Sequence, residues 1–243
     1  MLALAGAVAV ALMPPLPEPR AFRSLVDERA FLGIANFLNV VSNAPLLLVG
    51  AWGLYFVARG RPDAFAGPAE KRPYALLFLA VALTSFGSTY YHLAPGDDTG
   101  LMWDRLPMSV GFMALLSAVV VERVSVKAGL GLLIPLSVIG AATVVYWRWS
   151  ILSGVENILP YALVQYGGIA AIVAIALLFP SRYTRANDLF GAVAIYALAK
   201  LAEVLDAQIY ALGEIVSGHT LKHLIAALAL WWLVRMLKLR ACR

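Results

Sequence analysis

The sequence predicts an all-α fold, an integral membrane bundle of seven transmembrane helices, from its composition and from the length of its apolar stretches. Of the 243 residues, 62% are hydrophobic and only 14% are charged. The core of a soluble domain cannot use that much apolar surface. Because a spanning helix needs about 20 apolar residues, seven spans joined by short loops use most of the chain.

Seven apolar stretches have the length of a spanning helix, and short breaks with Pro, Gly or charged residues separate them. They do not alternate in the way that strands of a membrane barrel do. The expected spans are residues 36–58, 73–94, 101–121, 128–147, 157–179, 189–212 and 217–238. They define one transmembrane domain, 36–243, which follows an N-terminal lead-in, 1–35.

The lead-in begins with an apolar segment, residues 1–16, that is too short to span a membrane. It ends in prolines and lacks the basic start of a secretory signal. We expect a lipid-facing or disordered segment here, with an uncleaved signal as the alternative.

Cysteine content and charge exclude several classes of protein. Cys242 is the single cysteine, so an internal disulfide and a metal site built from cysteines are both excluded. The net charge of +5 comes from basic residues beside the apolar spans rather than along one helix face. Lipid headgroups explain this distribution better than nucleic acid, so the membrane is the expected partner.

The basic residues also predict the orientation, because cytoplasmic loops are enriched in Lys and Arg. One side of the expected bundle carries five of them, at Arg20, Arg23, Arg29, Arg105 and Arg148. The other side carries twelve, at Arg59, Arg61, Lys71, Arg72, Arg123, Lys127, Arg182, Arg185, Arg235, Lys238, Arg240 and Arg243. The N-terminus is therefore expected outside and the C-terminus in the cytoplasm.

Three histidines, the only ones in the chain, are the strongest candidates for a functional site. His92 ends the second span, while His219 and His223 begin the seventh. The spacing of the last two puts both rings on one helix face, one turn apart. The orientation brings all three to the external leaflet, and three imidazoles with one open position are a ligand set of catalytic zinc. Alternatively, histidines gather at helix ends because they are amphipathic.

Two further polar residues belong to the same layer. Asp104, at the expected outer start of the third span, is a functional candidate because ionisable residues near the apolar region are rare. Its alternative role is to complement the helix dipole. Ser88 precedes His92 by one turn and shares its face. Its alternative role is a hydrogen bond back to its own helix.

The sixth span contains three charged residues, which is unusual for a membrane helix. Lys200 and Glu203 are three residues apart and are expected to pair across one turn. Asp206 lies roughly 9 Å below the outer helix end, near the depth of His223. It is a candidate to accept the ring N–H of a zinc ligand. Lys222 either reaches lipid headgroups or meets an anionic substrate.

Taken in order, S-x-x-x-H (Ser88 and His92), the aspartate Asp104 and H-x-x-x-H (His219 and His223) resemble the CREST superfamily of membrane hydrolases. The stretch Asn-Phe-Leu-Asn-Val-Val-Ser-Asn-Ala-Pro, residues 36–45, resembles its alkaline ceramidase branch, and the span count and orientation fit that branch. The resemblance implies that the histidines hold zinc. It implies that the aspartate handles the proton of the attacking water and that the serine assists at the carbonyl oxygen.

The chain departs from this family at one site. Eukaryotic ceramidases have an acidic, tryptophan-containing N-terminal segment that binds calcium, whereas this chain has Leu-Val-Asp-Glu-Arg-Ala at residues 25–30. The departure argues against a complete Ca²⁺ site, of which Asp27 could retain a part.

The resemblance implies zinc-dependent hydrolysis of a ceramide-like N-acyl lipid that enters sideways from the external leaflet, periplasmic or lumenal. Two other classes compete with this interpretation. A proton-coupled transporter would use Lys200, Glu203 and Asp206, but no repeated halves or broken helices are evident in the sequence. A receptor or scaffold would keep the bundle and use zinc only for structure.

Overall fold

The computed structural model describes residues 13–19 and 23–243, and the chain in these ranges forms helices and loops without a strand. Most of the expected apolar segment 1–16 lies outside the described residues. The part that is described is held at Leu16, whose backbone forms hydrogen bonds with the side chain of Asn157 and the backbone of Ile158, just before α7 (Leu159–Ala162). The N–H of Leu16 donates to Asn157 at 3.3 Å, and its carbonyl accepts from Ile158 at 2.8 Å.

The helices follow the expected spans closely. Besides α7, they are α2 (Phe37–Val41), α3 (Ala44–Arg59), α4 (Lys71–Leu93), α5 (Asp98–Arg123), α6 (Val126–Leu152), the π-helical turn η4 (Leu163–Gly167), α8 (Gly168–Leu178), α9 (Asp188–Val204), α10 (Asp206–Tyr210) and α11 (Gly218–Leu239). Short 3₁₀ turns, η2 (Pro62–Ala64) and η3 (Pro68–Glu70), precede α4. Six helical segments of the described chain are long and apolar enough to cross a membrane, which makes this a multi-pass membrane protein.

The sixth expected span, residues 189–212, is not one helix. It breaks at Leu205 into α9, which has 17 residues, and α10, which has five. The reason is tertiary, because Asp206 at the start of α10 accepts a hydrogen bond from the first turn of α11. A polar contact between two helices therefore overrides the apolar pattern of this segment.

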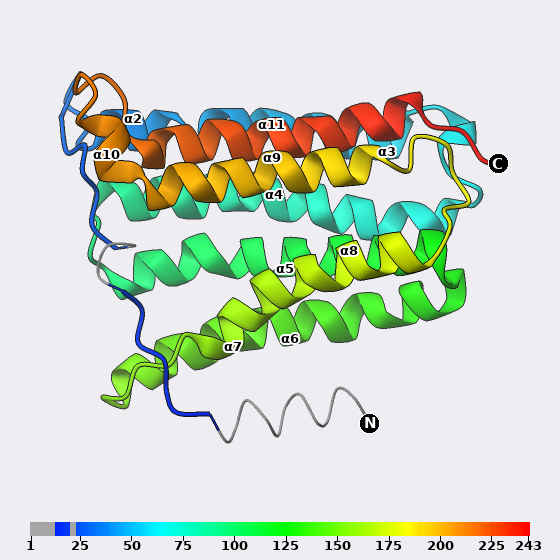
Figure 1. Ribbon diagram of the computed structural model, residues 1–243, viewed down its shortest axis with the longest axis horizontal. Coiled ribbons are helices and arrows are strands. Elements are labelled where there is room, and N and C mark those ends of the chain that lie inside the picture. The colour runs from blue at the N-terminus through cyan, green and yellow to red at the C-terminus, as the bar shows by residue number, and fades with distance from the viewer. Residues whose placement is uncertain (1–12, 20–22) are drawn as a thin grey trace.

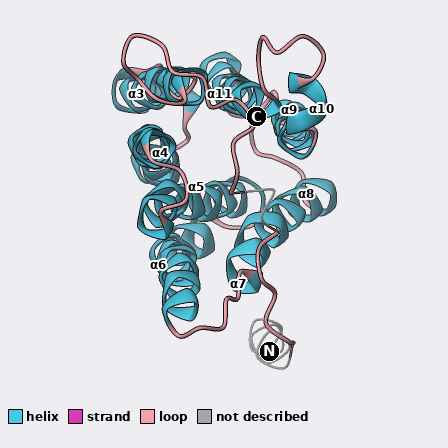
Figure 2. Ribbon diagram, turned by 90° about the vertical axis from the view of Figure 1, so that its left-hand side faces the viewer, coloured by secondary structure: helices cyan, strands magenta, loops and turns pink. Residues whose placement is uncertain are grey.

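The long helices lie side by side along the long axis of the molecule (Figure 1). The end view shows α3, α11 and α9 along one edge, with α5 nearer the centre and α6 on the opposite side (Figure 2). Small residues on α5, including Gly111, Ala114 and Ala118, are buried where it packs against its neighbours. Small side chains let membrane helices approach closely, which suits α5 to a central position.

Contacts at both ends join α9 to α11. A Cβ added at Gly218 would lie 2.1 Å from the carbonyl oxygen of Ala202, so the two backbones nearly touch there. At the far end of the seam, Arg235 on α11 lies 3.8 Å from the carboxylate of Asp188 on α9. The start of α11 is thus fixed against α9.

A buried arginine closes the end of the bundle opposite α10. Arg240, which the sequence assigns to a basic C-terminus, is only 1% exposed and forms an ion pair with Glu122 on α5. Its Nε donates to the carbonyl oxygen of Ala64 at 2.8 Å, and its guanidinium lies 4.1 Å from the ring centroid of Tyr183. The hydroxyl of Tyr74 donates to Glu122 at 2.8 Å, which completes the cluster.

Candidate metal centre

The three histidines converge inside the bundle. His92 lies in the last turn of α4, and His219 and His223 lie in the first two turns of α11. All three are buried, and their ring centroids are 4.8 to 5.0 Å apart. One ring nitrogen from each lies within 4.8 Å of the others. The expectation that the three rings share one depth is confirmed.

The arrangement of the ring nitrogens fits a metal ion. Two imidazoles on a tetrahedral zinc, each about 2.05 Å away, have nitrogens about 3.3 Å apart. Nε2 of His92 and Nε2 of His219 are 3.2 Å apart. Nδ1 of His223 meets the hydroxyl of Ser42 at 2.8 Å, which leaves its Nε2 for a metal. In the described part of the chain, no second cluster of His, Cys, Asp or Glu has this metal-binding geometry.

The start of α11 is built to hold its two histidines in place. The side chain of Ser217 caps the helix and accepts from the N–H of Thr220 at 3.1 Å. Asp206 accepts from the backbone N–H of His219 at 2.7 Å. The sequence suggests Asp206 as a partner for a ring N–H, whereas its contact is with the backbone. The first N–H groups of a helix have no partner within the helix, which explains why this carboxylate is used there.

Polar residues of the first span were not predicted to contact the histidines. Besides the bond of Ser42 to His223, the side chain of Asn36 donates to the backbone carbonyl of His92 at 2.9 Å. The hydroxyl of Thr220 donates to the side-chain carbonyl of Asn39 at 2.9 Å. The spacing of Asn36, Asn39 and Ser42 could have predicted these contacts, because polar residues every three positions in an apolar span must face a polar neighbour.

Asp104 lies deeper than the sequence predicts. Helix α5 begins at Asp98, and its cap is Asp97, whose side chain accepts from the N–H groups of Thr99 and Gly100 at 3.0 Å each. Asp104 is therefore in the second turn, where the helix dipole no longer explains it. Arg105, which the sequence analysis counts among the basic residues of the outer side, is buried in α5 next to Asp104.

Ser88 and Asp104 face each other across the α4–α5 contact. A Cβ added at Gly87 would lie 2.1 Å from the carbonyl oxygen of Trp103, so the helices touch through their backbones next to both residues. Both side chains are buried, and both line the same cavity.

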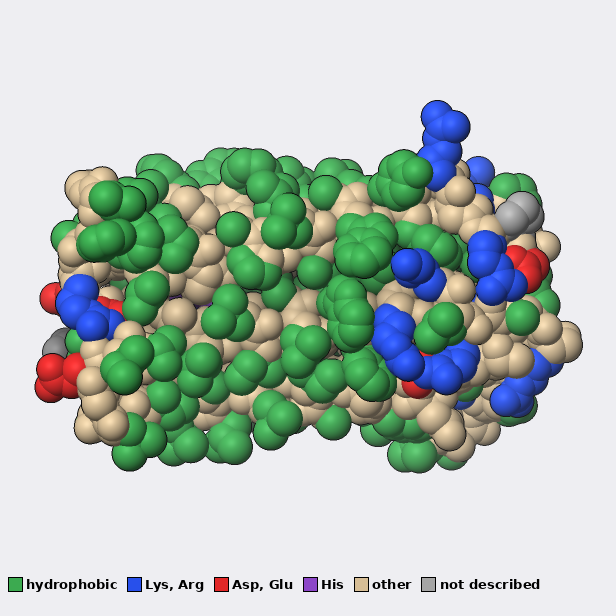
Figure 3. Space-filling model, turned by 90° about the horizontal axis from the view of Figure 1, so that it is seen from above, with side chains coloured by type: hydrophobic (Ala, Val, Ile, Leu, Met, Phe, Trp, Pro, Cys, Tyr) green, Lys and Arg blue, Asp and Glu red, His purple; other side chains and the backbone are tan. Residues whose placement is uncertain are grey.

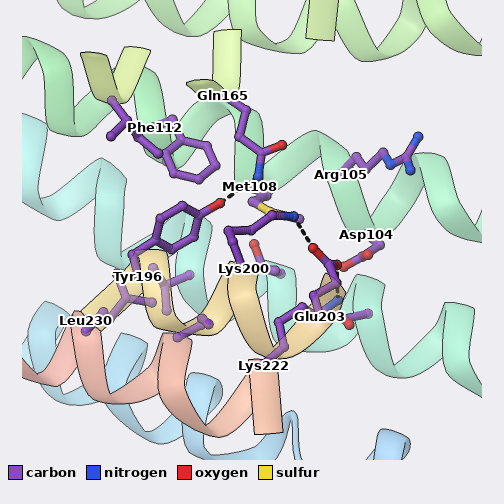
Figure 4. A pocket seen from close by; sticks show the side chains of 18 of the residues that line it. Asp104, Arg105, Met108, Phe112, Gln165, Tyr196, Lys200, Glu203, Lys222 and Leu230 are labelled. Carbon is purple, nitrogen blue, oxygen red and sulfur yellow. Dashed lines mark hydrogen bonds and ion pairs between the residues drawn. The ribbon is translucent and has the colours of Figure 1, made fainter. Parts of the chain in front are cut away.

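A cavity of about 360 Å³ connects these residues to an apolar interior. Ser88, Asp104 and the three histidines line it at one end. Figure 4 shows charged side chains gathered in one region, while Phe112, Tyr196 and Leu230 lie toward another. Along α11 the lining extends from His219 to Leu233, and the fourteen rises between these two residues amount to about 21 Å. The cavity is therefore long, narrow and polar beside the histidines.

A cluster of charged residues lies in the lining beside the histidines. Glu203 pairs with Lys200, as the sequence predicts, and its other oxygen accepts from Nζ of Lys222 at 3.0 Å. The same Nζ lies 3.0 Å from Nε2 of His219. The guanidinium of Arg105 pairs separately with Glu18, at the edge of the cavity.

In the loop before α2, an arginine neutralises the aspartate that was considered for a Ca²⁺ site. Nε and Nη2 of Arg29 donate to the two carboxylate oxygens of Asp27, at 2.7 and 2.8 Å. These bonds hold the pKa of Asp27 below its usual range. The carboxylate that could have retained part of a Ca²⁺ site is thus paired with an arginine from the same loop.

A scan against protein-family models finds no match to this chain, and a search of curated proteins finds none either. The resemblance to alkaline ceramidases therefore depends on the motif residues and remains a proposal.

Proposed function

We propose that this chain is a zinc-dependent hydrolase of N-acyl lipids that works within the membrane, as alkaline ceramidases do. The observation that carries the proposal is the convergence of three buried histidines at the polar end of an apolar cavity. Ser88 and Asp104 lie in the same lining. A transporter or a scaffold has no need for this combination.

Each residue of the centre has a role in amide hydrolysis. His92, His219 and His223 would hold the metal, which supplies a Lewis acid and an activated water when bound. Asp104 accepts a proton from the attacking water and delivers it to the leaving nitrogen. Ser88 donates a hydrogen bond to the carbonyl oxygen as negative charge develops there. A C–O bond forms, the C–N bond breaks, and the products are a fatty acid and an amine.

The shape of the cavity supports a lipid substrate. Its length of about 21 Å exceeds the hydrocarbon depth of one leaflet, which is about half of 30 Å. An acyl chain would lie along the apolar part while its amide reaches the histidines. A ceramide-like N-acyl lipid has this division between an apolar chain and a polar linkage.

We infer a bundle of seven spans with the N-terminus outside. The seventh span, in addition to the six long apolar segments, is formed by α9 together with α10. Lys and Arg side chains gather toward the C-terminal end on the face in Figure 3, and hydrophobic side chains cover the middle. Arg105 and Arg240 are buried and ion-paired, so neither counts as a loop charge. Eleven basic residues against four still favour a cytoplasmic C-terminus.

The orientation has a direct test. A reporter active only in the cytoplasm, fused after Arg243, is expected to give a signal, because the basic loops retain that end inside. The same reporter at the N-terminus is expected to stay silent. A well-expressed C-terminal fusion without signal, together with an active N-terminal one, would reverse the orientation and the side of the metal centre.

The function is tested by measuring metal content and turnover on the same detergent-purified protein. We expect about one zinc ion per chain and release of fatty acid from a panel of N-acyl lipids. His219→Ala and His223→Ala are expected to lose both, since Cys242 is exposed at the far end and cannot replace a ligand. Zinc without turnover would indicate a receptor or scaffold. Protein without any metal would favour a transporter.

A further inference from the structure

Two lysines share one carboxylate beside the metal centre. Glu203 binds both Lys200 and Lys222, and all three line the cavity, where their side chains are 12% to 24% exposed. Asp104, the other carboxylate of this region, lies close enough to Lys222 for their charges to interact. Figure 4 shows these side chains in one region of the cavity. The two lysines and two carboxylates balance one another.

A metal dication upsets this balance. The pair of Arg105 with Glu18 is neutral in itself, so it offers no negative charge to the centre. An excess of positive charge in a low-dielectric cavity is costly, and an anionic ligand compensates for it. The charge of the lining therefore favours a ligand that carries an anion close to the histidines.

Lys222 is the residue placed to receive that anion. Its ammonium has three N–H donors, of which one serves Glu203 and one faces Nε2 of His219. A ring nitrogen has one lone pair, so Nε2 of His219 cannot bind a metal and accept a hydrogen bond from Lys222 at the same time. Binding of the metal thus releases an N–H of Lys222 next to the metal, while Glu203 continues to hold the side chain.

We propose that Lys222 binds a carboxylate of the substrate and that the site takes an N-acyl α-amino acid; this rests on the proposed function. Nζ of Lys222 lies 3.0 Å from a metal-ligating nitrogen, so its anionic partner has to be adjacent to the reacting carbonyl. In an N-acyl α-amino acid the carboxylate is one carbon from the amide nitrogen, which meets this requirement. Water cleaves the C–N bond, and the free amino acid leaves with the proton delivered by Asp104.

A fatty acid product also carries a carboxylate on an apolar chain, so it is a second source of the same anion. The two sources are separated with three probes that cannot be hydrolysed: hexadecanesulfonylglycine, its neutral ethanolamine counterpart, and hexadecanoate. Binding of each to the zinc-loaded protein in detergent is measured by calorimetry, which does not depend on turnover. Zinc content is measured in parallel for every variant.

Wild type is expected to bind the glycine probe at least about tenfold more tightly than the ethanolamine probe, the range of one charge-assisted hydrogen bond. Lys222→Met should reduce that preference to within about twofold and retain its zinc, whereas Lys222→Arg should keep the preference. Lys238→Met is the matched control, because Lys238 is on the same helix but outside the cavity lining. It should change nothing.

A wild-type preference near unity, or a preference that survives Lys222→Met, would overturn the proposal. So would a variant in which only hexadecanoate binding falls, since that assigns Lys222 to the product. Failure of the proposed function gives a different result. A preference for the glycine probe without turnover of any amide would reject the hydrolase and keep the carboxylate subsite. Fatty acid release from neutral amides without that preference would reject the subsite and keep the hydrolase.

Discussion

Replacing Asp104 with asparagine is expected to lower kcat for an N-acyl lipid by about 10²- to 10⁴-fold, or 3 to 5 kcal/mol, because the amide cannot carry a proton. Asparagine has nearly the same size and can still form hydrogen bonds, so the fold and the zinc content should survive. Steady-state kinetics on an identified substrate, with elemental analysis of the same sample, measure both quantities.

Asp97→Asn is the matched control, since it makes the same substitution at the N-cap of the same helix. Asparagine caps a helix about as well as aspartate, so its turnover and its Tm should stay close to wild type. An Asp104→Asn variant that works within a few-fold of wild type would remove the proposed role. One that loses its zinc would make Asp104 a metal ligand instead of a proton carrier.

Glu122→Gln is expected to destabilise the protein by about 3 to 5 kcal/mol, because it leaves Arg240 as a buried charge without its counterion. Glutamine can still accept from Tyr74, so the loss reports the charge rather than that hydrogen bond. The free energy of unfolding in mixed micelles, or the shift in Tm, is the measurement.

Two comparisons show whether the ion pair is responsible. Asp63→Asn removes the counterion of Arg61 in a pair that is more than half exposed, and it should leave Tm nearly unchanged. Adding Arg240→Met to Glu122→Gln should recover most of the lost stability, because no unpaired charge remains. A single variant as stable as wild type would mean that the rings around Arg240 hold its charge without Glu122.

Apolar length and periodicity were sufficient to predict most of the fold. A long run of apolar residues in lipid has few alternatives to a helix, which is why α4, α6 and α11 begin and end within a few residues of the expected spans. The histidines were predictable because an ionisable residue at membrane depth requires a polar neighbour, and His92, His219 and His223 were expected at one depth.

Contacts between helices were not predictable from one span at a time. The break at Leu205 follows from the bond of Asp206 to α11, and the apolar pattern of that segment contains no sign of it. The bond of Ser42 to His223 joins residues 181 positions apart. Arg240 looked like an ordinary C-terminal charge because its burial depends on Glu122, which comes from another helix.

The contacts between α9 and α11 also limit how the proposed lipid substrate could reach the histidines. At one end the backbones nearly touch at Gly218, and at the other Arg235 lies close to Asp188. An acyl chain would have to separate these two helices to pass between them, which would also pull His219 away from Asp206. For the proposed substrate, the entrance is therefore expected through a different wall of the cavity, so that it can enter and leave without disturbing the histidines.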